Sequence, residues 1–111
     1  MVRAARLRRS ADIELVRKEG RSVRKDTFSA RVRQTNEPDV RVAVVAPRSV
    51  GSAVARNRAR RRVREAFRIA TTSGRPTSGL DIVVSARRDA LVAPFPQLRD
   101  EAATVLDGER R

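Results

Sequence analysis

Apolar residues in the first half of the chain are spaced in a way that predicts one helix followed by two strands. The helix is expected to begin at Ser10, whose side chain can cap it, and to end at Gly20. The polar segment Arg21–Thr27 is expected to be a loop. Segments 28–33 and 40–46 then alternate between apolar and polar residues, which is typical of strands with one buried face. The second of these strands is apolar on much of both faces, so we expect it inside the sheet.

The second half of the chain predicts a long helix, a third strand and a final helix. The long helix is expected to start near residues 52–53, and the loop Thr71–Gly79 separates it from the strand Leu80–Ala86. The final helix is expected to start near residues 94–95, because proline is tolerated in a first helical turn, and to stop at Gly108. In the long helix, residues at helical spacing form an apolar stripe that we expect to pack on the sheet: Ala55, Ala59, Val63, Ala66, Phe67 and Ala70.

The order of these elements is α-β-β-α-β-α, and the chain has 111 residues. This length fits a single α/β (α+β) domain, residues 1–111, with a small sheet packed by helices. The segment Met1–Arg9 is basic and has no evident apolar face. We therefore expect it to be a flexible arm, or an arm that becomes ordered when a partner binds.

The charge balance of the chain indicates what kind of partner it binds, which the hydrophobic pattern does not. The chain has 26 Lys and Arg residues against 13 Asp and Glu residues, a formal net charge of +13, and almost all of the basic residues are arginine. Arginine pairs with phosphate through a planar fork of donors and stacks on bases, which lysine does not do. The composition therefore indicates a protein that binds a polyanion, with a generic solvated surface as the alternative.

The residue types that are missing exclude several kinds of site. The chain has no cysteine, which rules out disulfides and zinc knuckles, and no histidine, which rules out a Ser-His-Asp triad and a histidine base. No apolar run approaches the roughly 20 residues that a membrane-spanning helix needs. The basic N-terminus lacks the apolar stretch of a secretory signal, so we expect a cytoplasmic protein that does not bind membranes.

The long helix carries seven arginines between Arg56 and Arg68, and Glu65 is the one acid among them. A solvated helix face normally interleaves charges of both signs, so this density favours a nucleic-acid-binding face over plain surface charge. Because the helix lies between two strands rather than in a helix-turn-helix pair, we expect structured RNA rather than DNA. Arg60 and Arg62 flank the apolar stripe, Arg56 leaves the first turn on the stripe side, and the opposite side holds Asn57, Arg58, Arg61, Arg64 and Arg68.

These residues resemble a known family. The run Arg48–Arg68, RSVGSAVARNRARRRVREAFR, is similar to the signature of the protein subunit of bacterial ribonuclease P. The hallmark of that signature, V-G-x-A-V-x-R-N-R-x-(+)-R-x-x-R-E, is matched by residues 50–65. The first helix, the strands Arg41–Ala46 and Leu80–Ala86, and the last helix also follow the family order, so the resemblance covers nearly the whole chain.

The resemblance implies a fold like that of a domain of a small-subunit ribosomal protein, with a left-handed βαβ crossover. It also implies a subunit that assists a catalytic RNA in removing the 5′ leader of precursor tRNA. The partners would be that RNA and precursor tRNA, with no further protein required. By the same resemblance, the residues that contact the catalytic RNA are Arg56, Asn57, Arg58, Arg60, Arg61, Arg62, Arg64 and Arg68.

A cleft between the first helix and the sheet is implied to hold the single-stranded leader. The matching positions here are Ile13, Arg17, Phe28 and Arg31. The family often has aromatic residues at these positions, and in this chain only Phe28 is aromatic. Arg17 and Arg31 can replace stacking rings by guanidinium stacking and phosphate pairing, although both also fit plain surface charge. Phe28 equally fits the core, because its strand face is apolar.

Phosphodiester hydrolysis needs a metal-activated water or a positioned acid and base. With no histidine and with aspartates scattered singly, we expect no catalytic residue and no metal site on the protein. The RNA subunit and its Mg²⁺ ions are then expected to carry out the cleavage. Two alternatives remain at this point: a ribosomal or ribosome-assembly RNA-binding protein, and a DNA-binding regulator.

Overall fold

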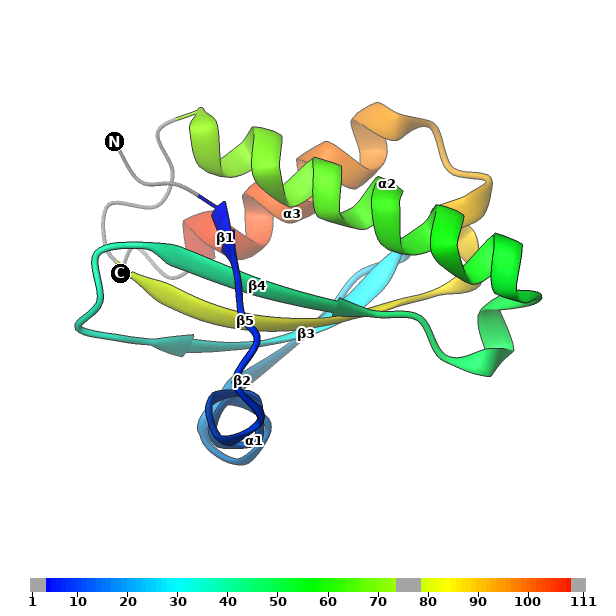
Figure 1. Ribbon diagram of the computed structural model, residues 1–111. Coiled ribbons are helices and arrows are strands. Elements are labelled where there is room, and N and C mark those ends of the chain that lie inside the picture. The colour runs from blue at the N-terminus through cyan, green and yellow to red at the C-terminus, as the bar shows by residue number, and fades with distance from the viewer. Residues whose placement is uncertain (1–3, 74–78, 109–111) are drawn as a thin grey trace.

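A five-stranded mixed sheet forms the middle layer of the molecule, with one helix on one face and two on the other (Figure 1). The structure is a computed structural model that describes residues 4–73 and 79–108. Its strands are β1 (Ala4–Arg6), β2 (Arg21–Arg24), β3 (Phe28–Gln34), β4 (Val40–Val45) and β5 (Leu80–Ala86). Its helices are α1 (Ser10–Glu19), α2 (Ala53–Thr72) and α3 (Phe95–Gly108), with short 3-10 turns at Arg48–Val50 and Arg88–Leu91.

The three helices and three strands expected from the sequence are confirmed, and so is the packing stripe of α2. The predicted alternation directs Phe28, Ala30 and Val32 of β3 toward α2 and α3, where all three are buried. The strand order is β1-β4-β5-β3-β2, so β4 lies inside the sheet as expected, and β5 takes the central place. The expectation that Ser10 caps α1 is wrong, because Ser10 is the first helical residue and no side chain caps that end.

Two strands were not expected, and both lie at edges of the sheet. β1 pairs in parallel with β4, with Arg6 opposite Val42, and Leu7 next to it is buried. The expectation of a flexible arm is therefore wrong for residues 4–7, while residues 1–3 lie outside the described residues. β2 pairs antiparallel with β3 inside the segment expected to be a loop. Edge strands this short bury no continuous face, so they leave no alternation in the sequence.

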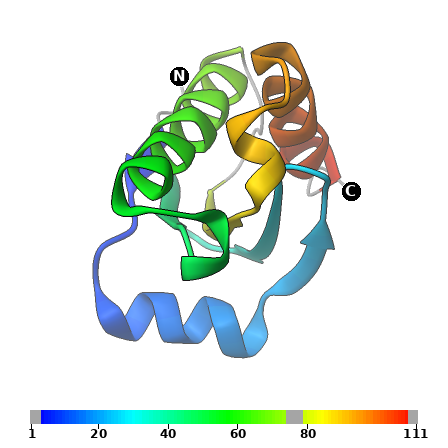
Figure 2. The same ribbon diagram turned by 90° about the vertical axis from the view of Figure 1, so that its right-hand side faces the viewer.

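The connection from β4 to β5 determines which edge of the sheet α2 covers. β4 and β5 are parallel neighbours joined through α2. Seen along these strands with α2 above the sheet, the path turns to the left from β4 to β5 (Figures 1 and 2). Crossovers of this kind are nearly always right-handed, so the left-handed path is the unusual feature of the fold. It places α2 beside β1 and α3 toward β2, which leaves the outer side of α2 uncovered (Figure 2).

The hydrophobic core is divided unequally between the two faces of the sheet. The main core lies between the sheet and the pair α2 and α3, and in it the rings of Phe28 and Phe67 pack with centroids 5.2 Å apart. On the other face, α1 rests on a small cluster of three buried residues: Leu7, Val16 and Val83. Because burial of apolar area is the main favourable term in packing, α1 is held less firmly than α2 and α3.

Two glycines define the ends of helices where another residue would not fit. Gly51 has a φ of 142°, a conformation that residues with a Cβ rarely adopt, and it turns the chain into α2. Ser52 then caps α2 by accepting a hydrogen bond from the Ala55 N–H at 3.2 Å. Gly20 ends α1 as expected, and a Cβ there would lie 2.4 Å from the Val16 carbonyl oxygen.

Candidate nucleic-acid interface

The outer side of α2 presents a row of guanidinium groups along several turns of the helix. We call Asn57, Arg58, Arg60, Arg61, Arg64 and Arg68 the arginine face. Asn57, Arg58, Arg61 and Arg68 are exposed, whereas Arg60 and Arg64 are half-buried. Arg68 pairs with Glu65, and Arg60 donates a hydrogen bond to the Asn57 side chain. Within the described part of the chain, Arg58 and Arg61 have no ion-pair partner, so these two are the most available to an anion.

Two arginines of the same helix point inward instead. The Arg56 guanidinium donates to the Ala46 carbonyl at 3.0 Å, which ties the first turn of α2 to the end of β4. Arg62 donates to the carbonyls of Ala90 at 2.7 Å and Ala93 at 2.8 Å, in the segment that leads to α3. Charge-assisted bonds of this kind satisfy backbone carbonyls in the segments that connect the strands to the α-helices. The sequence motif does not separate Arg56 and Arg62, whose donors fasten α2, from the arginines that face solvent.

Arg64 differs from the other members of the arginine face in the environment of its guanidinium group. Its side chain lies against β1, and burial lowers the pKa of the Arg64 guanidinium below its ordinary value. The nearby charges of Arg6 and Arg60 lower that pKa further. A shallow pocket of about 370 Å³ along the helix joins Arg64 to Arg60, Arg61 and Asn57, with the exposed Val54 at its end. The arginine face therefore has a shaped surface as well as charge.

The second candidate surface lies on the opposite face of the sheet, beside α1. A pocket of about 350 Å³ opens there, and we call it the α1 cleft. Arg17 and Arg31, both expected from the sequence, line it together. Arg17 also pairs with Glu14 at 3.4 Å, and half of its side chain stays exposed. The remaining lining residues are small: Ser22, Ser29, Ala30, Val45, Val83 and Ser85.

The other two residues expected in this cleft are not among those that line it. Phe28 is fully buried on the far face of the sheet against Phe67, so the expectation that it contacts the leader is wrong. The position of Phe28 in β3 determines the face of the sheet on which its side chain lies, because alternate residues of a strand point to opposite faces. Ile13 is half-buried and packs on the small cluster beneath α1. Ile13 thus supports α1, whereas the cleft surface comes from Arg17, Arg31 and small residues.

Three serines in the α1 cleft were missed by the sequence interpretation. Strand register pairs Ser29 with Ser85 and Ser22 with Arg31, so all of them point toward the cleft. The signal was present in part, since Ser29 and Arg31 share the polar side of an alternating strand. Ser22 lies on β2, which the sequence did not predict. Ser85 also lines a second pocket of about 410 Å³ together with Ser49, Arg87 and Arg88, so the cleft continues along the end of the sheet.

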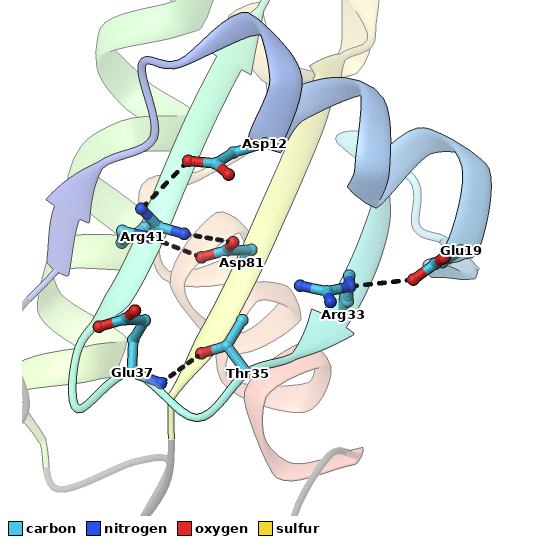
Figure 3. Close-up of polar contacts among 7 residues, drawn as sticks. All are labelled: Asp12, Glu19, Arg33, Thr35, Glu37, Arg41 and Asp81. Carbon is cyan, nitrogen blue, oxygen red and sulfur yellow. Dashed lines mark hydrogen bonds and ion pairs between the residues drawn. The ribbon is translucent and has the colours of Figure 1, made fainter.

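Ion pairs hold α1 in place over the sheet, as Figure 3 shows. Arg41 of β4 binds the nearly buried Asp81 of β5 through two hydrogen bonds of 2.8 and 2.6 Å, and it reaches Asp12 of α1 at 3.4 Å. The hydrogen bonds that Arg41 donates to Asp81 raise the pKa of Arg41 above its ordinary value. Glu19 at the other end of α1 pairs with Arg33 at 3.3 Å. The position of α1, which forms one wall of the cleft, therefore depends on charged contacts as well as on its small apolar cluster.

Arg31 is fixed within the cleft by one hydrogen bond and left unsatisfied at another atom. Its Nη2 donates to the Gly20 carbonyl at 3.0 Å, just where α1 ends. Its Nε is buried and has no hydrogen-bond partner among residues 4–73 and 79–108. Buried polar groups are nearly always paired in folded proteins, so an unpaired donor in a cleft wall is typical of a place where a ligand binds.

Comparison with known proteins decides the family. The sequence profile of the family described as Ribonuclease P matches residues 1–108. The chain belongs to the ribonuclease P protein family. The ribonuclease P protein component of Chloroflexus aurantiacus is 42% identical over 107 residues, which cover 96% of this chain and 78% of that protein. The component of Symbiobacterium thermophilum is 39% identical over 108 residues, covering 96% and 92%.

The fold agrees with this family. A solved structure of the ribonuclease P protein from Thermotoga maritima matches with a TM-score of 0.77 at 31% identity, covering 93% of this chain and 96% of that one. A ribonuclease P protein component is a subunit of an endoribonuclease that processes tRNA, and its partner is an RNA subunit. The ribosomal alternative is not favoured.

Two further findings concern the described residues of this ribonuclease P protein. No three acidic, histidine or cysteine side chains lie close enough together among residues 4–73 and 79–108 to hold a metal ion. None of the helices in these ranges combines the length and the apolar character needed to cross a membrane.

Proposed function

We propose that this ribonuclease P protein binds the catalytic RNA through the arginine face of α2 and holds the 5′ leader of precursor tRNA in the α1 cleft. Cleavage itself is then left to the RNA subunit and its Mg²⁺ ions. The observation that carries the proposal is the separation of two basic surfaces on opposite faces of one sheet. Two separate surfaces allow one small protein to contact two RNA molecules at once.

The arginine face supports contact with a folded RNA. Its guanidinium groups are spaced along α2 in steps of three and four residues, so they line one side of the helix. Arg58 and Arg61 are exposed without an acid partner in the described residues, and Asn57 adds an amide that can bond to a base edge or a ribose hydroxyl. Each phosphate neutralised releases counterions, so the affinity for RNA is expected to fall steeply with salt.

The α1 cleft supports contact with a single strand. Its floor consists of serine, alanine and valine, which leave room for a chain, and its arginines can pair with phosphates. Its serine hydroxyls can bond to ribose 2′-hydroxyls or phosphates. None of the described residues that line the cleft is aromatic, so the leader would be held by its sugar–phosphate backbone rather than by stacked bases. In this respect the cleft differs from what the resemblance implied.

The chemistry of cleavage is assigned to the RNA because the chain offers few groups suited to it. It has no histidine and no cysteine. The aspartate Asp81, nearly buried in the sheet, is engaged by Arg41 and is not available as a base. Mg²⁺ bound by the RNA would supply an activated water and stabilise the leaving oxygen. The protein would screen phosphate repulsion between the two RNAs and position the leader, and it would act in the cytoplasm without a further protein.

Reconstitution with the organism's candidate catalytic RNA and a precursor tRNA tests the proposal. At low Mg²⁺, where the RNA alone is slow, added protein is expected to stimulate removal of the leader. Arg61→Ala should reduce the affinity for the catalytic RNA, and Arg31→Ala should reduce the affinity of the holoenzyme for precursor tRNA. Arg99→Ala, at an exposed arginine of α3 away from both surfaces, is the matched control. Cleavage that is unchanged by the protein at low Mg²⁺ would refute the proposal.

A further inference from the structure

β1 lies beside α2 at the edge of the sheet, next to the arginine face (Figure 1). Arg6 pairs with Val42, whose side chain lies in the main core between the sheet and the pair α2 and α3. Paired residues of neighbouring strands point to the same face, so the Arg6 side chain is directed toward α2. Two adjoining pockets of about 310 and 130 Å³ lie there, and they share Arg6, Val42 and Arg64. We call this the β1–α2 groove. It exists only because residues 4–6 form a strand.

The charges in this groove are not balanced. None of the described residues that line either pocket is acidic, and the lining includes four arginines: Arg6, Arg8, Arg64 and Arg68. Arg68 has Glu65 as its partner, but neither Arg6 nor Arg64 takes part in an ion pair within the described residues. The Arg64 Nε is buried and makes no hydrogen bond to any part of the chain that the structure describes. A buried donor on a charged group that lacks a partner is unfavourable, and so is the proximity of like charges.

An anion in the groove would remove both of these costs. The lowered pKa of Arg64, caused first by burial and then by Arg6 and Arg60, is consistent with cations crowded together without a counter-charge. Arginine forks bind phosphate oxygens through paired N–H bonds, which favours a phosphate over a simple halide. The floor includes Phe67, which is fully buried and exposes no ring face, so the groove does not favour a stacked base.

We propose that the β1–α2 groove is a phosphate-binding site, in which Arg6 and Arg64 clamp one backbone phosphate of the catalytic RNA. The proposal rests on the proposed function, since it extends the arginine face beyond α2 to β1. The same phosphate would bridge β1 and α2 and so hold the three-residue edge strand on the sheet. Arg60, one turn before Arg64, and Arg68, one turn after it, flank the bound phosphate and continue the row along the RNA strand.

The site itself is tested with inorganic pyrophosphate and the full chain. The Nε–Hε resonance of Arg64 in a ¹⁵N-labelled sample is expected to shift and saturate as pyrophosphate is added, because this is the buried donor. Arg6→Gln should weaken that binding roughly tenfold, the scale of one lost charge-assisted contact. Arg99→Gln, which removes a charge from α3, should leave it unchanged. An Arg64 resonance that does not move, or equal binding in both variants, would overturn the site.

The source of the phosphate is tested with the catalytic RNA. Arg6→Gln is expected to weaken binding to that RNA and to lower the slope of log affinity against log salt by about one unit. Arg64→Lys, which keeps the charge but loses the fork, should retain the slope and lose part of the affinity. If Arg61→Ala weakens RNA binding but Arg6→Gln does not, the groove is not an RNA site and the proposed function stands. If neither variant weakens it, the proposed function fails as well.

Discussion

At the scale of single residues, the arginines of α2 differ in what their donors contact. Arg58 and Arg61 face solvent, so we expect Arg58→Ala and Arg61→Ala to weaken binding to the catalytic RNA. Each should also reduce the salt slope by about one unit per lost phosphate contact. Equilibrium binding across a salt series measures both quantities. Unchanged affinity and slope in both variants would mean that this side of the helix is only a solvated surface.

Arg62 belongs to the same motif, yet its donors are used inside the molecule. Because it bonds to the Ala90 and Ala93 carbonyls, Arg62→Ala is expected to lower the free energy of unfolding by about 1.5–3 kcal/mol. Arg61→Ala, the neighbouring exposed position, should change it by no more than about 0.5 kcal/mol. Denaturant titration of the two variants gives the comparison. Equal stabilities would contradict a fastening role for Arg62.

Glu101 of α3 gives a residue-scale prediction for pH. It accepts hydrogen bonds from the Thr27 hydroxyl at 2.6 Å, the Thr27 N–H at 3.1 Å and the Gln97 amide at 3.0 Å. Burial acts to raise the pKa of Glu101, but these hydrogen bonds outweigh it and hold the pKa below its ordinary value of 4.5. The unfolded chain therefore takes up the proton first, so the contribution to stability is present above about pH 4.5 and is lost as the pH falls through the folded value.

Glu101→Gln is expected to lower the free energy of unfolding by about 1–2 kcal/mol at pH 7, the scale of hydrogen bonds to a charged group. The difference from the wild-type chain should shrink as the pH falls below about 4.5 toward 3, because the unfolded wild-type chain then takes up a proton and the contribution of the charge to stability declines. Glu14→Gln, at an exposed position of α1, serves as the control and should show little change at either pH. A difference that stays constant between pH 7 and pH 3 would contradict the role assigned to the charge.

At the scale of elements, α1 depends on the ion pairs beneath it. Asp81→Asn removes the charge that Arg41 binds and is expected to cost about 2–3 kcal/mol, since Asp81 is only 2% exposed. Amide hydrogen exchange should accelerate in α1 more than in α2, and the affinity for precursor tRNA should fall while that for the catalytic RNA is kept. Arg33→Gln, which breaks a more exposed pair, should cost less than about 1 kcal/mol. Equal acceleration in α1 and α2 would point to general destabilisation instead.

The elements also show what the sequence could and could not predict. Helices and strands with one buried face carry their periodicity in the sequence, so α1, α2, α3, β3, β4 and β5 were all predicted. β1 and β2 take their structure from backbone pairing at the edges, which no pattern of side chains records. The β1–α2 groove could not be predicted from the sequence for the same reason, because β1 forms one of its sides. Within a predicted strand, the face of Phe28 followed from the alternation, but the resemblance placed it in the cleft and was wrong.

At the scale of the whole molecule, a net charge of +13 is spread over surfaces on both sides of one sheet. The arginine face lies on α2, and the α1 cleft lies on the other side, so the chain can lie between two RNAs. The motif predicted the first surface from one continuous helix. The second is assembled from α1, β2, β3, β4 and β5, and its serines are brought together by strand register alone. Long-range pairing of this kind is what the sequence leaves undetermined.

The makeup of the α1 cleft leads to a prediction about how the holoenzyme selects its substrates. The described residues that line the α1 cleft include arginines and serines but no aromatic side chain. On the proposed function, the cleft contacts the sugar–phosphate backbone of the leader, so the identity of the leader bases should matter little. Precursor tRNAs whose leaders are all adenosine or all uridine, equal in length, are expected to bind the holoenzyme within about twofold of each other, because a stacking contact would be worth roughly 1–3 kcal/mol per base. Affinity for both should fall steeply and in parallel as monovalent salt is raised.

Mature tRNA, which lacks the leader, is the control for contacts outside the cleft, and its affinity should depend less on salt. Arg31→Ala should bring the salt dependence of precursor tRNA binding closer to that of mature tRNA, because it removes a cationic side chain from the cleft wall. A difference of tenfold or more between the adenosine and uridine leaders would contradict backbone recognition. It would mean that the cleft reads bases through contacts that its serines and the guanidinium planes of Arg17 and Arg31 provide.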